Sequence, residues 1–312
     1  LRHEVLFPFP GSVTYNPIGR AGDGNFPKLF FARPVDPIRS CPLATDDPAP
    51  DSDPAPAAPR RPWEDALLAI AFLTRLPVPA RHDGGAGALG RAAWAFPLAG
   101  GVVGGCGAGI ILATAGSGLH PLAAALLALA VMAVVTGALH EDGLADFADG
   151  LGVAGRDRRL AVMRDSHIGA FGVLALVFAT GLKATALASL AGPGAAALVL
   201  VAAGALSRAA LVPTMIVLSP ARADGLAKDA GRPPVWAAGL ALVLGFAALA
   251  PLLPILGPGV GTLAAAGLAA GLFACWAMHA AVGGHTGDSL GAQQQIVEIA
   301  VYLAAATAEI SL

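Results

Sequence analysis

Long apolar segments with almost no charged residues recur along this chain. A helix crosses the roughly 30 Å hydrocarbon core of a bilayer with about 20 apolar residues. Six segments approach or exceed that length, at residues 92–115, 121–139, 169–191, 195–218, 235–256 and 260–278. One more segment, residues 297–312, is shorter and contains Glu298 and Glu309. We therefore predict an all-α integral membrane protein with six or seven transmembrane helices.

The overall composition supports a membrane protein and excludes other classes. Only 13% of the 312 residues are charged and 56% are hydrophobic, whereas soluble domains average about 25% charged residues. The net charge of −2 leaves no basic excess for binding nucleic acid. The three cysteines form no Cys-x-x-Cys motif, and their odd number argues against a disulfide framework.

The N-terminal part of the chain differs from the rest. Residues 1–60 are rich in Pro, Asp and Ala, a composition typical of a disordered tail, and we expect this tail, or over-extended gene start, to have no role in chemistry. Residues 63–76 are apolar but contain Glu64, Asp65 and Arg75, which predicts a helix lying in the membrane interface. Residues 61–312 are then a single polytopic catalytic domain.

The loops between the predicted spans alternate between basic and uncharged. Lys and Arg gather before residue 92, in residues 140–168 and in residues 219–234, whereas residues 116–120, 192–194 and 257–259 have none. Basic loops remain on the cytoplasmic side of a membrane. The alternation predicts a cytoplasmic N-terminus and places every substantial polar loop, including residues 281–295, on the cytoplasmic face of the inner membrane.

Glycines recur every four residues in the first predicted span, at Gly101, Gly105 and Gly109. Small residues at this spacing let two membrane helices approach closely. We expect this stripe to face a neighbouring helix.

The densest polar feature is residues 140–150, which directly follow the second span. Asp142, Asp146 and Asp149 are spaced i, i+4 and i+7, so a helix places them on one face, with Glu141 beside them. Like charges at this spacing repel each other, and a divalent cation such as Mg²⁺ offsets that repulsion directly. The alternative is a solvated helix end whose acidic residues have no ligand.

Two further polar segments border the later spans. In residues 163–172, Arg164 can grip a phosphate and Asp165 can ligate a metal, or Asp165 simply caps the next helix. In residues 283–295, backbone N–H groups near Gly284, Thr286 and Gly287 can approach an anion, and Asp288 can join a metal shell. The alternative for the second segment is an ordinary glycine-rich turn.

Two cations lie inside predicted spans, Lys183 in the third and Arg208 in the fourth. Charged residues within a membrane are costly and usually have a function or a partner. Both side chains can neutralise phosphate in a site cavity, or both can pair with internal carboxylates.

These polar segments, together with residues 72–79 and 96–101, resemble the adenosylcobinamide-GDP ribazoletransferase family, also called cobalamin-5′-phosphate synthases. The resemblance covers roughly residues 63–312. It implies a Mg²⁺-dependent membrane enzyme in which a hydroxyl of α-ribazole, or of its 5′-phosphate, attacks adenosylcobinamide-GDP and GMP leaves. It also implies contact with membrane lipid, and it leaves open a homo-oligomer or association with other cobalamin-synthesis enzymes.

The resemblance gives the polar residues roles. Asp142, Asp146 and Asp149 would bind Mg²⁺, with Glu141, Asp165 and Asp288 as additional ligands. Asp149 would accept the proton of the attacking hydroxyl. Arg164 and Lys183 would hold phosphates, and Arg208 would help to neutralise them.

Two other functions compete with this one. Phosphotransferases that use CDP-linked alcohols also place Asp clusters at the membrane surface, but their motif needs an Arg and wider spacing than Asp142-Gly143-Leu144-Ala145-Asp146 provides. A transporter would use Lys183 and Arg208 in a substrate path, yet the polar residues concentrate at span ends and the acidic motif has no duplicate in the second half.

Overall fold

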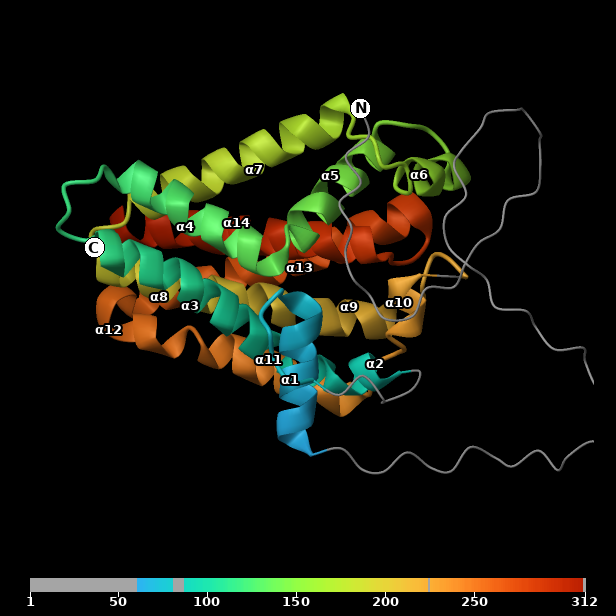
Figure 1. Ribbon diagram of the computed structural model, residues 1–312, viewed down its shortest axis with the longest axis horizontal. Helices are drawn as coiled ribbons and strands as arrows, with labels where there is room; N and C mark the ends of the chain where they lie inside the picture. Colours follow the sequence, from blue (N-terminus) through green and yellow to red (C-terminus); the bar gives the residue numbers. More distant parts are fainter. Residues whose placement is uncertain (1–60, 81–86, 224, 311–312) are drawn as a thin grey trace, which may run out of the picture. The chain divides into compact units, whose positions relative to one another are not determined.

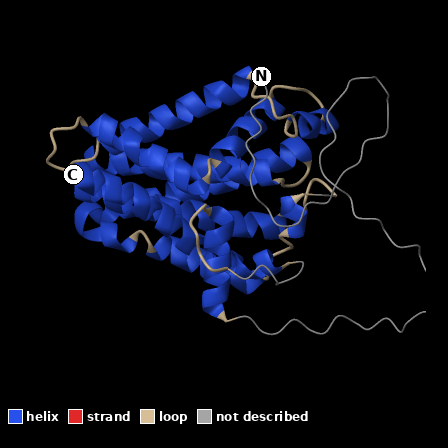
Figure 2. Cartoon of the chain, in the orientation of Figure 1, coloured by secondary structure: helices blue, strands red, loops and turns tan. Residues whose placement is uncertain are grey.

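The computed structural model describes residues 61–80, 87–223 and 225–310. Within these ranges helices are joined by loops and turns, and the β-structure is one isolated parallel bridge between Pro220 and His285 (Figure 2). The predicted tail, residues 1–60, lies outside the described residues. The main helices are α1 (Pro62–Leu73), α2 (Ala88–Ala92), α3 (Phe96–Thr114), α4 (Pro121–Thr136), α5 (Leu139–Leu151), α6 (Arg156–Val162), α7 (Ala170–Ala188), α8 (Pro193–Ala209), α9 (Leu211–Val217), α10 (Leu226–Asp229), α11 (Val235–Ala247), α12 (Leu253–Leu256), α13 (Val260–Val282) and α14 (Gly287–Ile310).

The expectation of an all-helical membrane protein is confirmed, with four or five candidate spans by length and composition beside the six or seven predicted. Among the described residues, four helical stretches are long and apolar enough to cross a membrane, namely Ala88–Thr114, Ala170–Ala188, Pro193–Val217 and Val235–Val282, and α4 with α5 makes a fifth if that bent pair is one span.

Two features account for the difference. The predicted fifth and sixth spans are counted together in the single stretch Val235–Val282. Its 48 residues would extend about 72 Å as one helix, and Figure 1 shows the chain reversing at α12, so α11 and α13 are separate helices. The predicted seventh span, residues 297–312, is the end of α14, which begins at Gly287 and is not among the candidate spans.

The N-terminal helix α1 lies across the direction of the long helices (Figure 1). It buries Leu68, Ala69 and Leu73, while Trp63 stays 53% exposed. One buried face and one exposed aromatic residue fit the predicted interfacial helix.

The close approach of α3 to α8 uses a different glycine stripe from the predicted one. A methyl group at Gly100 would collide with the Gly204 carbonyl, and one at Gly104 would collide with the Leu200 carbonyl. A methyl group at Gly101, Gly105 or Gly109 would meet nothing within 4 Å. The expectation for that stripe is wrong, because the sequence holds two glycine stripes one residue apart and only packing selects between them.

Large apolar side chains remain exposed along α7 and α13. Phe178 on α7 is 64% exposed, and Phe273 and Trp276 on α13 are 56% and 64% exposed. Soluble proteins rarely expose so much contiguous apolar surface, so these faces fit contact with membrane lipid.

A sharp bend between α4 and α5 sets the direction of the acidic motif. The two helices meet at 91°. Gly137 and Ala138 both have left-handed backbone angles, with φ of 65° and 56°. A left-handed residue other than glycine costs about 1–2 kcal/mol, so packing must hold Ala138 in place. The bend turns α5 away from α4 and against α14.

Candidate active site

The acidic motif meets the last helix where α5 packs against α14. A methyl group at Gly143 would lie 2.7 Å from the Asp288 carbonyl oxygen, and one at Gly291 would lie 3.2 Å from the Gly143 Cα atom. Only glycine permits this approach. The contact brings Asp142 and Asp146 of α5 into the same region as Asp288 of α14.

Asp146 has the most strongly perturbed carboxyl group of this region. Its pKa is raised from 3.8 to about 6, first by burial and then by the charges of Asp142, Asp288 and Asp149, whereas Arg222 opposes them. The pKa of Asp288 is also raised, first by burial and then by Asp142, against the effect of Arg222. The three predicted Asp residues and Asp288 thus form one electrostatic group, here called the acidic cluster.

Asp149 connects the acidic cluster to the start of α7. Its two carboxylate oxygens accept hydrogen bonds from the backbone N–H groups of Gly169, at 2.7 Å, and Gly172, at 2.9 Å. A methyl group on either glycine would collide with the carboxylate. Asp149 therefore stabilises the N-terminus of α7, where a negative charge is favourable. Its predicted roles as metal ligand and proton acceptor stay predictions.

Arg222 was missed by the sequence analysis as a site residue. It lies in the loop before α10, where its Nη1 donates to Asp288 Oδ2 at 3.3 Å and its Nη2 donates to the Leu160 carbonyl at 3.0 Å. In the sequence, Arg222 is one of several basic residues in a loop. No spacing rule connects it to Asp288.

The glycine-rich segment before α14 is ordered by its own side chains. Thr286 caps α14, because its Oγ1 accepts from the Ser289 N–H at 3.1 Å and its own N–H donates to Ser289 Oγ at 2.9 Å. A methyl group at Gly284 would collide with the Ser219 carbonyl, whereas Gly287 has open space around it. The predicted anion contacts of this segment stay predictions.

Arg164 and Asp165 lie in an exposed turn before α7. Asp165 Oδ1 accepts from the His167 N–H at 3.1 Å and contacts His167 Nδ1 at 2.6 Å, and these bonds lower the pKa of Asp165. Asp165 is not among the charges that shift the pKa of Asp146. The structure therefore does not bring Asp165 into the acidic cluster, and its metal role stays a prediction.

Lys183 and Arg208 converge on a carboxylate that the sequence analysis did not assign to the site. Lys183 Nζ lies 3.3 Å from Glu298 Oε2, and Arg208 Nη1 lies 3.0 Å from Glu298 Oε1. Lys183 also donates to Gln295 Oε1 at 2.7 Å, and Gln295 donates to Glu141 Oε1 at 3.0 Å. This set is the buried ion network. Lys183 and Arg208 therefore pair with an internal carboxylate, which was the alternative to phosphate binding.

The donor chemistry of the acidic cluster fits a divalent metal. Its members supply carboxylate oxygens, which Mg²⁺ prefers. Among the residues that the structure describes, however, no three His, Cys, Asp or Glu side chains are already arranged to hold an ion. Binding would therefore require these side chains to rotate toward the metal.

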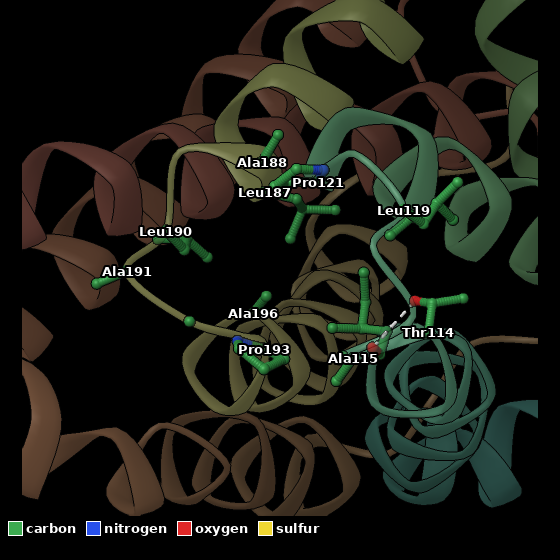
Figure 3. Close-up of a pocket in the computed structure, with 14 residues that line it drawn as sticks. Thr114, Ala115, Leu119, Pro121, Leu187, Ala188, Leu190, Ala191, Pro193 and Ala196 are labelled. Atoms are coloured by element: carbon green, nitrogen blue, oxygen red, sulfur yellow. Dashed lines mark hydrogen bonds between the residues drawn. The ribbon is translucent and has the colours of Figure 1, made fainter.

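A cavity of about 290 Å³ lies at the opposite ends of the helices, between the turns that join α3 to α4 and α7 to α8 (Figure 3). Residues such as Leu119, Leu187 and Pro193 line it, and none of its lining residues is charged. It offers no group for acid–base or metal chemistry.

These features define a helical integral membrane protein with a carboxylate-rich site where α5, α14 and the Arg222 loop meet. The chain belongs to the cobalamin-5-phosphate synthase family (CobS), whose sequence profile matches residues 65–306. No solved structure matches it.

Curated relatives carry the name adenosylcobinamide-GDP ribazoletransferase. A protein of Rhizobium etli (strain CIAT 652) is 47% identical over 252 residues, which cover 78% of this chain and 96% of the relative. One of Bradyrhizobium diazoefficiens is 45% identical over 244 residues, covering 78% and 93%. One of Azorhizobium caulinodans is 47% identical over 245 residues, covering 76% and 92%.

Proposed function

We propose that this chain is an adenosylcobinamide-GDP ribazoletransferase of cobalamin biosynthesis. It would join adenosylcobinamide-GDP to α-ribazole, or to its 5′-phosphate, and release GMP. The observation that carries the proposal is family membership across residues 65–306, and that range contains the whole acidic cluster. The match spans nearly the full length of the relatives, so the comparison concerns the whole enzyme.

Asp142, Asp146 and Asp288 would hold the Mg²⁺ ion of this reaction. Bound there, the ion would neutralise the negative charge that develops on the departing phosphate. The protein itself would bring the two substrates together and orient them at the junction of α5 and α14. The raised pKa of Asp146 supports this assignment, because a neighbouring positive charge would stabilise the ionised carboxylates of the site.

The reaction transfers a phosphorus group between two oxygen atoms. The acceptor hydroxyl oxygen forms a bond to the phosphorus on the corrinoid arm, and the bond from that phosphorus to the GMP oxygen breaks with its electron pair. The hydroxyl proton passes to a carboxylate. Asp149, which this assignment leaves outside the metal ligands, would accept that proton, and the N–H groups of Gly169 and Gly172 hold its carboxylate in position.

We further propose that the site faces the cytoplasm at the inner membrane. Arg156, Arg159 and Arg222 lie in the segments that surround the acidic cluster, and these segments belong to the basic loops of the sequence. Retention of basic loops in the cytoplasm supports this orientation. It would also place the site where a nucleotide-linked donor is supplied.

The test is turnover by the purified protein in detergent or lipid. Adenosylcobinamide-GDP and α-ribazole 5′-phosphate are mixed with and without Mg²⁺, and GMP release is measured for the wild type, Asp146→Ala and Asp157→Asn. Asp157 is a matched control, because its side chain is 95% exposed on α6. GMP release that needs Mg²⁺, disappears in Asp146→Ala and persists in Asp157→Asn supports the proposal. A folded wild type that releases no GMP refutes it.

A further inference from the structure

Arg222 is a cation beside the acidic cluster to which nothing above assigns a role in the reaction. We infer that Arg222 binds the diphosphate of the nucleotide-linked donor and holds it against the carboxylates of α5 and α14. This inference rests on the proposed function, because it takes a nucleoside diphosphate as the substrate group.

The guanidinium of Arg222 has donors that its protein contacts do not use. An arginine side chain carries five N–H donors. Nη1 and Nη2 contact Asp288 and the Leu160 carbonyl, whereas Nε is buried and has no hydrogen-bond partner. A buried donor without a partner is unfavourable. The Arg222 side chain is 16% exposed, and a small rotation that brings Nε to a bound phosphate would satisfy this donor and form the bidentate contact that arginine favours.

Two of the three cations first expected to hold phosphate are engaged elsewhere. Lys183 and Arg208 are 4% and 2% exposed, and both contact the carboxylate of Glu298. A phosphate could reach them only by replacing that buried partner. The side chain of Arg222 is 16% exposed and its partner Asp288 is 25% exposed, so a ligand that reaches the acidic cluster also reaches Arg222.

The backbone around Arg222 is held in place on two sides. The Ala221 N–H donates to the His285 carbonyl at 2.8 Å, and the His285 N–H donates to the Ser219 carbonyl at 3.0 Å. Arg156 Nη2 donates to the Ala221 carbonyl at 2.7 Å. A cation presented from an anchored loop loses little freedom when the ligand binds, which is the condition for effective positioning.

The charges also favour an anion at Arg222. A metal ion held by Asp288 would take up part of the carboxylate charge that Arg222 faces. The diphosphate would supply negative charge to Arg222 at the same place.

The experiment compares Arg222→Gln and Arg222→Lys with Arg156→Gln. Arg156→Gln is the matched control. Arg156 donates a hydrogen bond to the carbonyl of Ala221, next to Arg222, but its charge is not among those that shift the pKa of Asp146 or Asp288. Two quantities are measured for each folded protein: the Kd of GDP in the presence of Mg²⁺, by calorimetry, and the KM values of donor and acceptor.

We expect Arg222→Gln to raise the donor KM and the Kd of GDP by about 10- to 100-fold, the effect of losing a charge-assisted hydrogen bond. The acceptor KM should change by less than about twofold. Arg222→Lys keeps the charge but not the fork of donors, so its values should fall between those of the wild type and Arg222→Gln. Arg156→Gln should weaken the binding of GDP and donor less than Arg222→Gln does, because Arg156 anchors the loop through the Ala221 carbonyl.

The inference is overturned if Arg222→Gln keeps the wild-type donor KM and Kd of GDP. It is also overturned if Arg156→Gln weakens binding equally, since Arg222 would then only anchor its loop. Failure of the proposed function looks different: the wild type would bind GDP through Arg222 but release no GMP from the corrinoid donor. That result would retain Arg222 as a diphosphate ligand and refute the ribazoletransferase assignment.

Discussion

Replacing Asp146 by asparagine should stabilise the metal-free protein at pH 8. Burial and three neighbouring carboxylates raise the pKa of Asp146 from 3.8 to about 6. A folded-state pKa above the ordinary value means that the fold favours the protonated form. The contribution of Asp146 to stability is therefore most favourable below about pH 4 and is lost as pH rises through about 6, and the asparagine variant avoids this loss.

The magnitude follows from the difference in pKa. About two pH units correspond to about 3 kcal/mol. Asp146 is only half-buried, so solvent and salt screen its charge, and we reduce the expected gain to about 1 kcal/mol. For a protein of this size, that gain raises the unfolding temperature by about 2–4 °C.

The assay is thermal unfolding in detergent with a chelator, at pH 8 and near pH 4, followed by addition of Mg²⁺. The gain of Asp146→Asn should shrink toward pH 4, where the wild-type carboxyl is protonated as well. Mg²⁺ should then stabilise the wild type, because a ligand of the folded state adds RT ln(1 + [L]/Kd), and stabilise the variant less. A variant that is no more stable than the wild type at pH 8 without Mg²⁺ would refute this electrostatic account of the cluster.

Three more results are expected. Gly172→Ala should lower the unfolding free energy by about 1–3 kcal/mol and reduce turnover, because the new methyl group collides with the Asp149 carboxylate. Gly181→Ala is the control, because its added methyl group meets nothing within 4 Å; equal losses in both variants would contradict the capping of α7 by Asp149. Glu298→Ala should cost about 3–5 kcal/mol in thermal or denaturant unfolding, because it leaves two buried cations without their carboxylate; wild-type stability would disprove the network's role. Mg²⁺ affinity, measured by calorimetry, should weaken as pH falls below about 6, because a proton competes for Asp146; affinity that is constant from pH 8 to pH 5 would exclude Asp146 as a ligand.

The sequence predicts the local features of this protein well. The apolar segments, the helical acidic motif and the helix near residue 63 all depend on neighbours along the chain, which the i, i+4 spacing and the composition describe. The 91° bend after α4 was not predicted, because a left-handed Ala138 is stable only through its surroundings. The predicted seventh span is the end of α14, since composition alone does not show that this helix begins at Gly287.

The partners of charged residues were the least predictable part of the site. Lys183, Arg208 and Glu298 lie in three different apolar segments, and only the packing of α7, α8 and α14 brings them together. A rule that pairs opposite charges found inside predicted spans would have suggested the network. No comparable rule leads from Arg222 to Asp288, since both lie in polar segments that contain several other charged residues.

The balance of charge explains why a cation belongs at one group of polar residues and not at the other. The buried ion network has two cations and two carboxylates and is neutral, its members being Lys183, Arg208, Glu141 and Glu298. Among the described residues, the acidic cluster has four carboxylates against the guanidinium of Arg222, and burial together with the resulting repulsion raises the pKa of Asp146. A divalent ion would relieve repulsion in the cluster but would introduce uncompensated charge into the network. The same reasoning directs an anionic substrate to the outer rim of the cluster, where the metal and Arg222 would together offset its charge.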